Sequence, residues 1–293
     1  MDGYFIWDVY PVIVKTVIPG IGFKLELRYY GILFAAMVLG SYFLWRWQMH
    51  RAGYPEREID AWFLLGLASI VIGAHLGHII FYNWDYYMAH PKEIFFFKGM
   101  GLSSHGATIG VIIGLLIYSR IYKIPAMEVF DSNTFPAALA AMLVRLGNFF
   151  NHEIVGRVTD VPWAVRFKYF QDQGANPRHP SQLYEFFLGV VVIIVLYLVD
   201  RRYGVRRPRG ILAATFLIVY FSGRFLIEFF KEFQKLDPTR SFLTMGQYLS
   251  LPFILTGFIV LFYAMRSGPR DPMAWSRATV QKKKRTRSPK KKK

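Results

Sequence analysis

Residues 145–157 read Arg145-Leu-Gly-Asn148-Phe-Phe-Asn151-His152-Glu153-Ile-Val-Gly156-Arg157, directly after a long apolar run that begins near Phe135. Six of these thirteen residues are strongly polar or charged. An arginine near the centre of a bilayer costs roughly 2.5–3.5 kcal/mol on insertion scales, so such residues usually face a cavity or a partner. A lone arginine could instead extend to the headgroups. The clustering of six such residues favours the interpretation that this stretch forms the wall of a buried polar site.

The composition around this stretch is that of a helical membrane protein. The chain has 293 residues, of which 54% are hydrophobic and 18% aromatic. Several apolar runs approach the roughly 20 residues that a helix needs to cross a bilayer. We therefore expect an all-α, polytopic membrane protein with about seven transmembrane helices. The candidate spans are residues 29–48, 62–82, 104–119, 131–150, 184–200, 210–230 and 245–265.

Charge and cysteine content exclude several classes of function. The chain contains no cysteine, which excludes disulfides, an enzyme thiol nucleophile and thiolate metal sites. The net charge is +17, but 12 of the 36 lysines and arginines follow Tyr263. A basic tail of this kind more commonly faces anionic headgroups than nucleic acid, so we expect membrane lipids and no nucleic acid as partners. The first residues show no removable signal peptide.

The loops predict an orientation and a domain plan. With the amino terminus outside, inside segments carry 22 basic residues and outside segments 12, which places the carboxyl terminus in the cytoplasm. Residues 1–28 are expected to form an outer interfacial arm and residues 29–265 the membrane domain. Within that domain, the long proline-containing loop 157–183 is expected to form a small outer cap. Residues 266–293 are expected to form a basic, disordered cytoplasmic tail.

The pattern Arg-Leu-Gly-Asn-Phe-x-Asn-x-Glu-x-x-Gly-Arg resembles the signature of the prolipoprotein diacylglyceryl transferases, and further similar segments extend from about Tyr30 to Leu251. The resemblance implies a bacterial inner-membrane enzyme that acts on phosphatidylglycerol. Its second substrate is the prolipoprotein signal peptide with its lipobox cysteine. The diacylglyceryl group passes to the cysteine thiol, a thioether forms and glycerol phosphate is released. Neither a metal nor an organic cofactor is expected.

Tyr30 and two histidines each have a structural and a functional reading. A tyrosine at the start of a span usually belongs to the interfacial aromatic belt, whereas the resemblance places Tyr30 at the family's functional tyrosine. His75 and His78 have the i, i+3 spacing that could hold a metal, but no carboxylate follows at a ligand spacing, which favours packing or hydrogen bonding. The family usually has arginine where this chain has His75, so the role of His75 stays open.

His105 lies in Ser103-Ser104-His105-Gly106-Ala107, at the expected outer end of the third span. A lone histidine here is often structural, but an unperturbed pKa of about 6.5 also suits a general base. The segment is similar to the family's His-Gly-Gly motif, with Ala107 in place of the second glycine. Alanine would be strained there only if the backbone needed a positive φ.

Three further segments complete the candidate set. Residues 178–185 can be a simple helix start, but they also resemble a family motif, which makes His179 and Gln182 site-supporting residues. Arg224 and Glu228 lie one helical turn apart and could form only an internal ion pair; the resemblance instead implies an essential arginine. Residues 245–251 also match the family, although their polar side chains could merely cap a helix.

The proposed chemistry fits these residues. Arg145 and Arg224 together suit a phosphate clamp, because a guanidinium binds phosphate oxygens bidentately and stays charged. They would stabilise the charge on the departing phosphate, and His105 is the candidate base for a thiol with a pKa of about 8.5. The remaining substrate-binding candidates, which would orient the headgroup, arginines and peptide, are Asn148, Asn151, Glu153, Gly156, Arg157 and Glu228.

Two other readings use the same residues. A lipid or anion transporter would need polar residues that reach both faces and would often show repeat symmetry, but the sequence has no internal repeat. A membrane scaffold with structural arginines would tolerate Arg145→Lys and Arg224→Lys. The transferase reading predicts a large loss of activity from both changes, since lysine lacks the bidentate fork.

Overall fold

A computed structural model describes residues 3–18, 20, 22–95, 101–232 and 242–270. Long helices occupy all seven of the expected spans, and the all-α prediction is confirmed. The long helices are α1 (Tyr29–Arg51), α2 (Glu56–Tyr82), α4 (Ser104–Tyr122), α5 (Ala126–Phe150), α6 (Ser181–Tyr203), α7 (Ile211–Ile227) and α8 (Met245–Ser267). Helix α7 continues as a 3-10 turn, η3 (Glu228–Phe230).

Five of these helices are long and apolar enough to cross a membrane, namely α2, α4, α6, α7 with its extension to Phe230, and α8. At most 28% of the residues in their apolar windows are buried within the chain, so most apolar side chains face outward. This is the pattern of helices whose solvent is lipid. The chain is thus a multi-pass membrane protein, and crossings by α1 and α5 stay a prediction.

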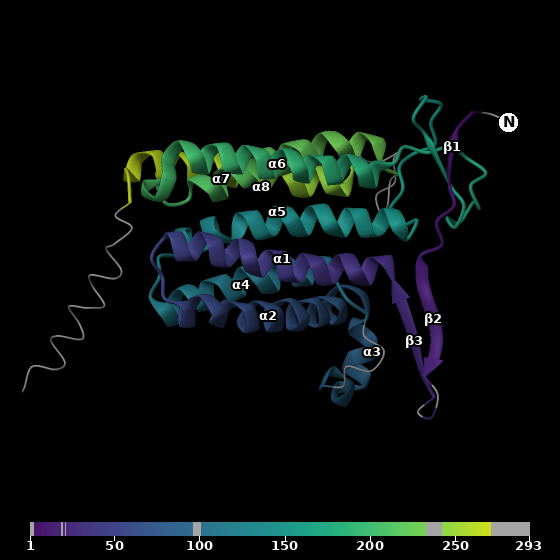
Figure 1. The fold of residues 1–293 in the computed structure, drawn as a ribbon, viewed down its shortest axis with the longest axis horizontal. Coiled ribbons are helices and arrows are strands. Elements are labelled where there is room, and N and C mark those ends of the chain that lie inside the picture. The colour runs from purple at the N-terminus through teal and green to yellow at the C-terminus, as the bar shows by residue number, and fades with distance from the viewer. Residues whose placement is uncertain (1–2, 19, 21, 96–100, 233–241, 271–293) are drawn as a thin grey trace, which may run out of the picture. The chain divides into compact units, whose positions relative to one another are not determined.

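The chain folds into two compact units. Among the described residues, the first unit comprises those up to position 45 and from 131 to 270, and the second those from 46 to 130. In the first unit, α6, α7 and α8 run side by side (Figure 1). Its apolar core is formed by Phe135, Ala138, Val192, Leu196, Ile211, Leu212 and Ala264. Three helices of this unit, α5, α6 and α7, carry Arg145, Asn148, Gln182 and Arg224 among the residues singled out in the sequence.

The expected interfacial arm contains three strands, which the sequence did not predict. Strand β1 (Phe5–Trp7) pairs in parallel with β4 (Val165–Phe167), and β2 (Val12–Ile18) forms an antiparallel hairpin with β3 (Phe23–Arg28). Trp7 packs with a buried cluster of Phe149, Val155, Val165 and Phe167. Strand β1 of the arm and the expected cap loop therefore pack together beside the end of α5.

In the second unit, α2 packs against α4 through glycines on both helices. A Cβ added at Gly73 would lie 2.5 Å from the Gly106 carbonyl oxygen and 2.7 Å from the Gly110 Cα. The two backbones are in direct contact at these positions. A short helix, α3 (Trp84–Ala89), and a 3-10 turn, η1 (Pro91–Phe95), follow α2.

Candidate active site

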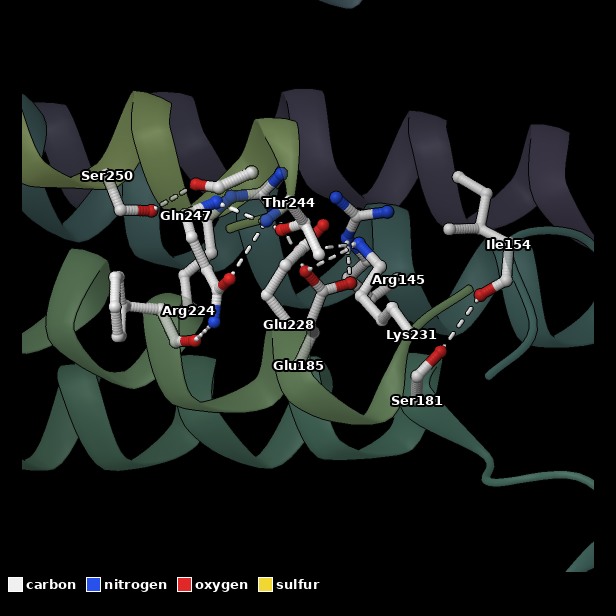
Figure 2. Close-up of polar contacts among 12 residues, drawn as sticks. Arg145, Ile154, Ser181, Glu185, Arg224, Glu228, Lys231, Thr244, Gln247 and Ser250 are labelled. Carbon is white, nitrogen blue, oxygen red and sulfur yellow. Dashed lines mark hydrogen bonds and ion pairs between the residues drawn. The ribbon is translucent and has the colours of Figure 1, made fainter. Parts of the chain in front are cut away.

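A buried carboxylate holds the two arginines that the sequence singled out. Glu185, in the second turn of α6, has a side chain that is 2% exposed. Its Oε2 lies 2.7 Å from Nε of Arg145 on α5, and its Oε1 accepts a hydrogen bond from Nη1 of Arg224 on α7 at 2.9 Å. Figure 2 shows both guanidinium groups pointing toward this one carboxylate. We call these three residues the arginine clamp.

Lys231 adds a third cation beside the clamp. Its Nζ lies 3.6 Å from Glu185 Oε1 and 3.4 Å from Glu228 Oε2, and the side chain is 4% exposed. The Glu228 carboxylate fits because the adjacent helix α8 has a glycine there: a Cβ on Gly246 would lie 2.5 Å from Glu228 Oε1. Helix α8 begins beside this group with a capping box formed by Thr244 and Gln247.

The charges of this group do not balance. Three cations, Arg145, Arg224 and Lys231, are in contact with two carboxylates, those of Glu185 and Glu228. A buried charge without an opposite charge is costly, because desolvation is not offset by a partner. The group as described is therefore suited to accept one further anion, such as a phosphate group.

The polar residues that follow Arg145 form a chain of hydrogen bonds around Glu153. Arg145 Nη1 donates to Asn148 Oδ1 at 3.4 Å, and Asn148 donates to Glu153 Oε2 at 3.2 Å. Asn151 donates to Glu153 Oε1 at 3.3 Å, while Gln182 donates to the Glu153 carbonyl oxygen at 2.6 Å. Asn148 and Asn151 thus meet at the Glu153 carboxylate, Gln182 binds the backbone of the same residue, and Asn148 connects the group to the clamp.

An abrupt chain reversal makes this arrangement possible. His152 and Ile154 both have φ of 55°, in the left-handed region that branched side chains such as isoleucine rarely adopt. Strained backbone of this kind persists only where the surroundings fix it. Here Ser181 Oγ donates to the Ile154 carbonyl oxygen at 3.0 Å, and His152 hydrogen-bonds the Val9 carbonyl oxygen at 2.9 Å. The reversal turns Glu153 back toward Asn148.

Gly156 and Arg157 lie where three segments of the chain cross. The Gly156 N–H donates to the His179 carbonyl oxygen at 3.0 Å, and the Arg157 N–H donates to the Phe230 carbonyl oxygen at 2.9 Å. A Cβ on Gly156 would lie 2.6 Å from both of these carbonyl oxygens, so only glycine fits without a shift. Arg157 Nε also donates to the Lys231 carbonyl oxygen at 2.7 Å. This crossing fixes the backbone beneath Lys231.

Tyr30 and His179 lie at the edges of the same unit. The Tyr30 ring packs against α5 at Gly147, where an added Cβ would lie 2.7 Å from the ring. His179 Nδ1 lies 3.0 Å from the Tyr184 hydroxyl oxygen. Burial, and secondarily the charge of Arg157, lowers the pKa of His179 below its usual 6.5, so the imidazole is neutral at pH 7.

His105 lies in the second unit, near the amino terminus of α4, and its side chain is exposed. The helix start is capped by Ser103, whose Oγ accepts a hydrogen bond from the Gly106 N–H at 3.2 Å. Ala107 lies inside the regular helix and has a negative φ, so the replacement of the family's glycine causes no left-handed strain. The close helix contact falls on Gly106 instead.

The two histidines of α2 follow the packing reading. His75 Nε2 lies 2.9 Å from the Ile94 carbonyl oxygen and its ring contacts Tyr87 edge-on. His78 Nε2 lies 3.0 Å from Asn83 Nδ2. Both histidines therefore contribute hydrogen bonds within the second unit, as the spacing without a carboxylate predicted.

The structure corrects the pairing within α7 and adds two residues. One interpretation of the sequence gave Arg224 and Glu228 only an ion pair with each other. In the structure, Arg224 pairs with Glu185 on α6 and Glu228 contacts Lys231, so that interpretation is wrong. The sequence analysis did not select Glu185 or Lys231. A usable signal was present for Glu185, since an acidic residue at the start of an apolar span needs a cationic partner. The helix-start and cap readings of 178–185 and 245–251 are confirmed at the same time.

Comparison with known proteins identifies the family. The family model described as prolipoprotein diacylglyceryl transferase matches residues 17–263. A phosphatidylglycerol–prolipoprotein diacylglyceryl transferase of Chloroherpeton thalassium is 38% identical over 266 residues, covering 90% of this chain and 96% of the relative. Enzymes of the same name from Bacteroides fragilis and Geobacter sulfurreducens are 35% and 39% identical, covering 82% and 84% of this chain and 90% and 94% of the relatives. The chain belongs to the prolipoprotein diacylglyceryl transferase family.

Proposed function

We propose that this protein transfers the diacylglyceryl group of phosphatidylglycerol to the lipobox cysteine of a prolipoprotein signal peptide, the first step of bacterial lipoprotein maturation. The observation that carries the proposal is the arginine clamp with Lys231, in which two half-buried arginines and a buried lysine surround buried carboxylates and outnumber them by one. Family membership supplies the substrates. The enzyme would work in the inner membrane, with its amino terminus outside, the 157–183 cap on the outer face and the 266–293 tail in the cytoplasm.

The reaction breaks the bond between the diacylglyceryl carbon and a phosphate oxygen, and the cysteine sulfur bonds to that carbon. Both electrons of the broken bond leave with glycerol phosphate, so negative charge grows on the phosphate. Arg145 uses Nε and Nη1 on Glu185 and Asn148, which leaves Nη2 for a phosphate oxygen. Arg224 and Lys231 approach the same carboxylate from other segments. Fixed cations in a site of low dielectric stabilise such a charge strongly.

The thiol must lose its proton before or during the attack. A cysteine has an ordinary pKa of about 8.5, so a neutral imidazole is a suitable acceptor near pH 7. We assign this role to His105, which is exposed at the start of α4. A small residue follows it at Gly106, where the helix start is capped through Ser103.

The remaining residues would hold the substrates in place. Glu153 gathers the amides of Asn148, Asn151 and Gln182, which makes the headgroup wall rigid. We assign substrate contacts to this wall and to Tyr30, Gly156, Arg157, His179 and Glu228. Rigid positioning of this kind removes much of the entropy cost of bringing two substrates together.

The test is a reaction with defined substrates. The purified protein is incubated with phosphatidylglycerol and a synthetic lipobox peptide, and mass spectrometry detects the diacylglyceryl addition while released glycerol phosphate is assayed. A peptide with serine in place of the cysteine should give no product. Arg145→Ala and Arg224→Lys should each lower kcat at least about 100-fold, because a donor to the departing charge or its bidentate geometry is lost.

A matched control uses an arginine outside the site. Arg201→Lys changes an exposed side chain at the far end of α6 and should keep wild-type activity. His105→Gln should lower kcat and shift the pH dependence of the reaction. A folded wild-type protein that binds phosphatidylglycerol but forms no thioether would refute the transferase and favour lipid transport.

A further inference from the structure

A second group of buried charges lies at the opposite end of the helices that carry the clamp. Asp131 of α5, Asp200 of α6 and Arg207 of the α6–α7 connection are each at most 1% exposed. Arg207 Nη1 donates to Asp200 Oδ1 at 3.0 Å, and Arg207 Nε lies 3.9 Å from Asp131 Oδ2. None of these residues has a role in the transfer reaction described above. We call them the register cluster.

Asp131 also caps a helix to which it does not belong. The N–H groups of Gly210 and Ala213, at the start of α7, donate to Asp131 Oδ2 and Oδ1 at 2.8 and 2.9 Å. The first N–H groups of a helix lack partners inside that helix and need an outside acceptor. Gly210 has no side chain to provide one, so α5 supplies it. One carboxylate thereby ties the start of α7 to α5.

The register cluster and the clamp join the same three helices at matching intervals. Arg145 follows Asp131 by 14 residues on α5, and Arg224 follows Gly210 by 14 residues on α7. On α6, Glu185 precedes Asp200 by 15 residues. At a rise of 1.5 Å per residue, each interval is about 21–23 Å. Each of the three helices is therefore held by the clamp at one end and by the register cluster at the other.

Such a connection controls alignment more than stability. A buried ion pair gains little net free energy, because desolvation offsets the attraction, but its geometry can specify a register. A shift of one residue along a helix would move a side chain by 1.5 Å and rotate it by about 100°. Either change would break the 2.7 Å contact between Arg145 and Glu185. In addition, α5 contains Pro136 between Asp131 and Arg145, where one helical hydrogen bond is missing.

We propose that Asp131, Asp200 and Arg207 are positioning residues, which set the register of α5, α6 and α7 and thereby hold Arg145, Glu185 and Arg224 in the geometry of the clamp. The inference rests on the proposed transferase function for its kinetic consequences. Asp131 is the key residue, since it contacts both the Arg207 side chain and the backbone of α7.

The kinetic test is Asp131→Asn. The amide offers only one acceptor oxygen and no charge, so the α7 cap is incomplete and the bond network must shift. We expect kcat to fall about 10-fold or more, with KM for phosphatidylglycerol changed less than about 3-fold, because a loosened clamp still attracts the phosphate but no longer meets the departing charge. The matched control is Phe135→Leu, one turn along α5 in the apolar core, which should lower the Tm while kcat is kept.

A double-mutant cycle separates positioning from general destabilisation. If the register cluster acts through the clamp, Asp131→Asn should cost much less activity in an Arg224→Lys background than in the wild type. Additive losses of activity would overturn the proposal. The proposal would also be overturned if Phe135→Leu had the same Tm as Asp131→Asn and an equal loss of kcat.

A readout without catalysis keeps this inference apart from the proposed function. Because the chain has no cysteine, spin labels can be placed at Phe187→Cys on α6 and Leu226→Cys on α7, both about 60% exposed. Asp131→Asn should shift or broaden the distance between the labels, and Phe135→Leu should not. An unchanged distance would refute the register role. If the wild-type protein formed no thioether product in the activity assay, only the proposed transferase function would be refuted.

Discussion

Among single residues, a few buried groups determine what their neighbours can do. Arg145 and Arg224 are recognisable as functional from sequence, but their geometry depends on Glu185, which contacts both. His152 has a similar organising part in the turn between α5 and the cap. Its Nε2 donates to the Val9 carbonyl oxygen, and its ring contacts Trp7 and Phe167. Within the described part of the chain, its buried Nδ1 has no hydrogen-bond partner.

This environment predicts a loss of stability in mild acid. Burial lowers the pKa of His152 below its usual 6.5, despite the hydrogen bond to Val9 and the charge of Asp8, which act in the opposite direction. The unfolded chain then binds a proton more readily than the folded one. Stability should therefore be full above about pH 6.5 and should fall as the pH drops below it. The thermal unfolding midpoint, measured between pH 7.5 and 5.5, checks this.

The matched variant for that series is His152→Gln, which can still donate to Val9 but does not titrate. Its midpoint should depend less on pH than that of the wild type. His179, whose pKa is lowered in the same direction, should supply the residual dependence. An equally steep pH dependence in His152→Gln would show that other groups cause it.

Among the elements, the closest packing is that of α2 against α4. Gly73 and Gly77 of α2 lie against Gly106 and Gly110 of α4, with no room for a Cβ at any of the four positions. Small residues let membrane helices approach closely, which substitutes for the hydrophobic effect that is absent in lipid. This contact sets where the amino terminus of α4, and with it His105, lies within the second unit.

Gly110→Val should push these two helices apart. A Cβ at Gly110 would overlap the Ser69 carbonyl oxygen and lie 2.9 Å from the Gly73 Cα. Because both neighbours are backbone, we expect a loss of about 1–3 kcal/mol in stability and a fall in transferase activity. Unfolding in detergent followed by circular dichroism gives the first quantity. Gly31→Ala is the control, since nothing lies within 4 Å of a Cβ there; equal losses in both variants would contradict the packing explanation.

For the whole molecule, the remaining question is how the seven long helices cross the membrane. The basic residues of the loops predict the amino terminus and the 157–183 cap outside, and the 201–209 loop in the cytoplasm. The absence of cysteine makes labelling with single cysteines unambiguous. Asp160→Cys in the cap should react with a membrane-impermeant maleimide in intact cells. Arg202→Cys, also exposed and at the end of α6, should react only after permeabilisation.

These two variants control for each other, because both side chains are exposed and differ only in their expected side. Labelling of both from outside would mean that the number of crossings between them is even. Labelling of Arg202→Cys alone in intact cells would reverse the orientation. The reversed orientation would also move the proposed active site away from the outer half of the membrane.

The sequence alone determined the long helices and pointed to the candidate residues Arg145 and Arg224, because both depend on local properties. A run of apolar residues predicts a span wherever the rest of the chain lies, and polar residues such as Arg145 and Arg224 are costly in lipid without a function. The match of the signature to a known family also needs no structure. The short strands escaped prediction, since β1 and β4 have three residues each and are far apart in the chain.

Only the tertiary structure decided which charges meet. Arg224 reaches Glu185 across 39 positions, and Asp131 binds the start of α7 across 79 positions. Such pairs depend on the packing of whole helices, and a charge in the sequence does not specify its distant partner. Lys231 shows this most clearly, because nothing in its local sequence distinguishes it from an ordinary lysine at the end of a span, whereas its folded position beside two buried carboxylates makes it part of the site.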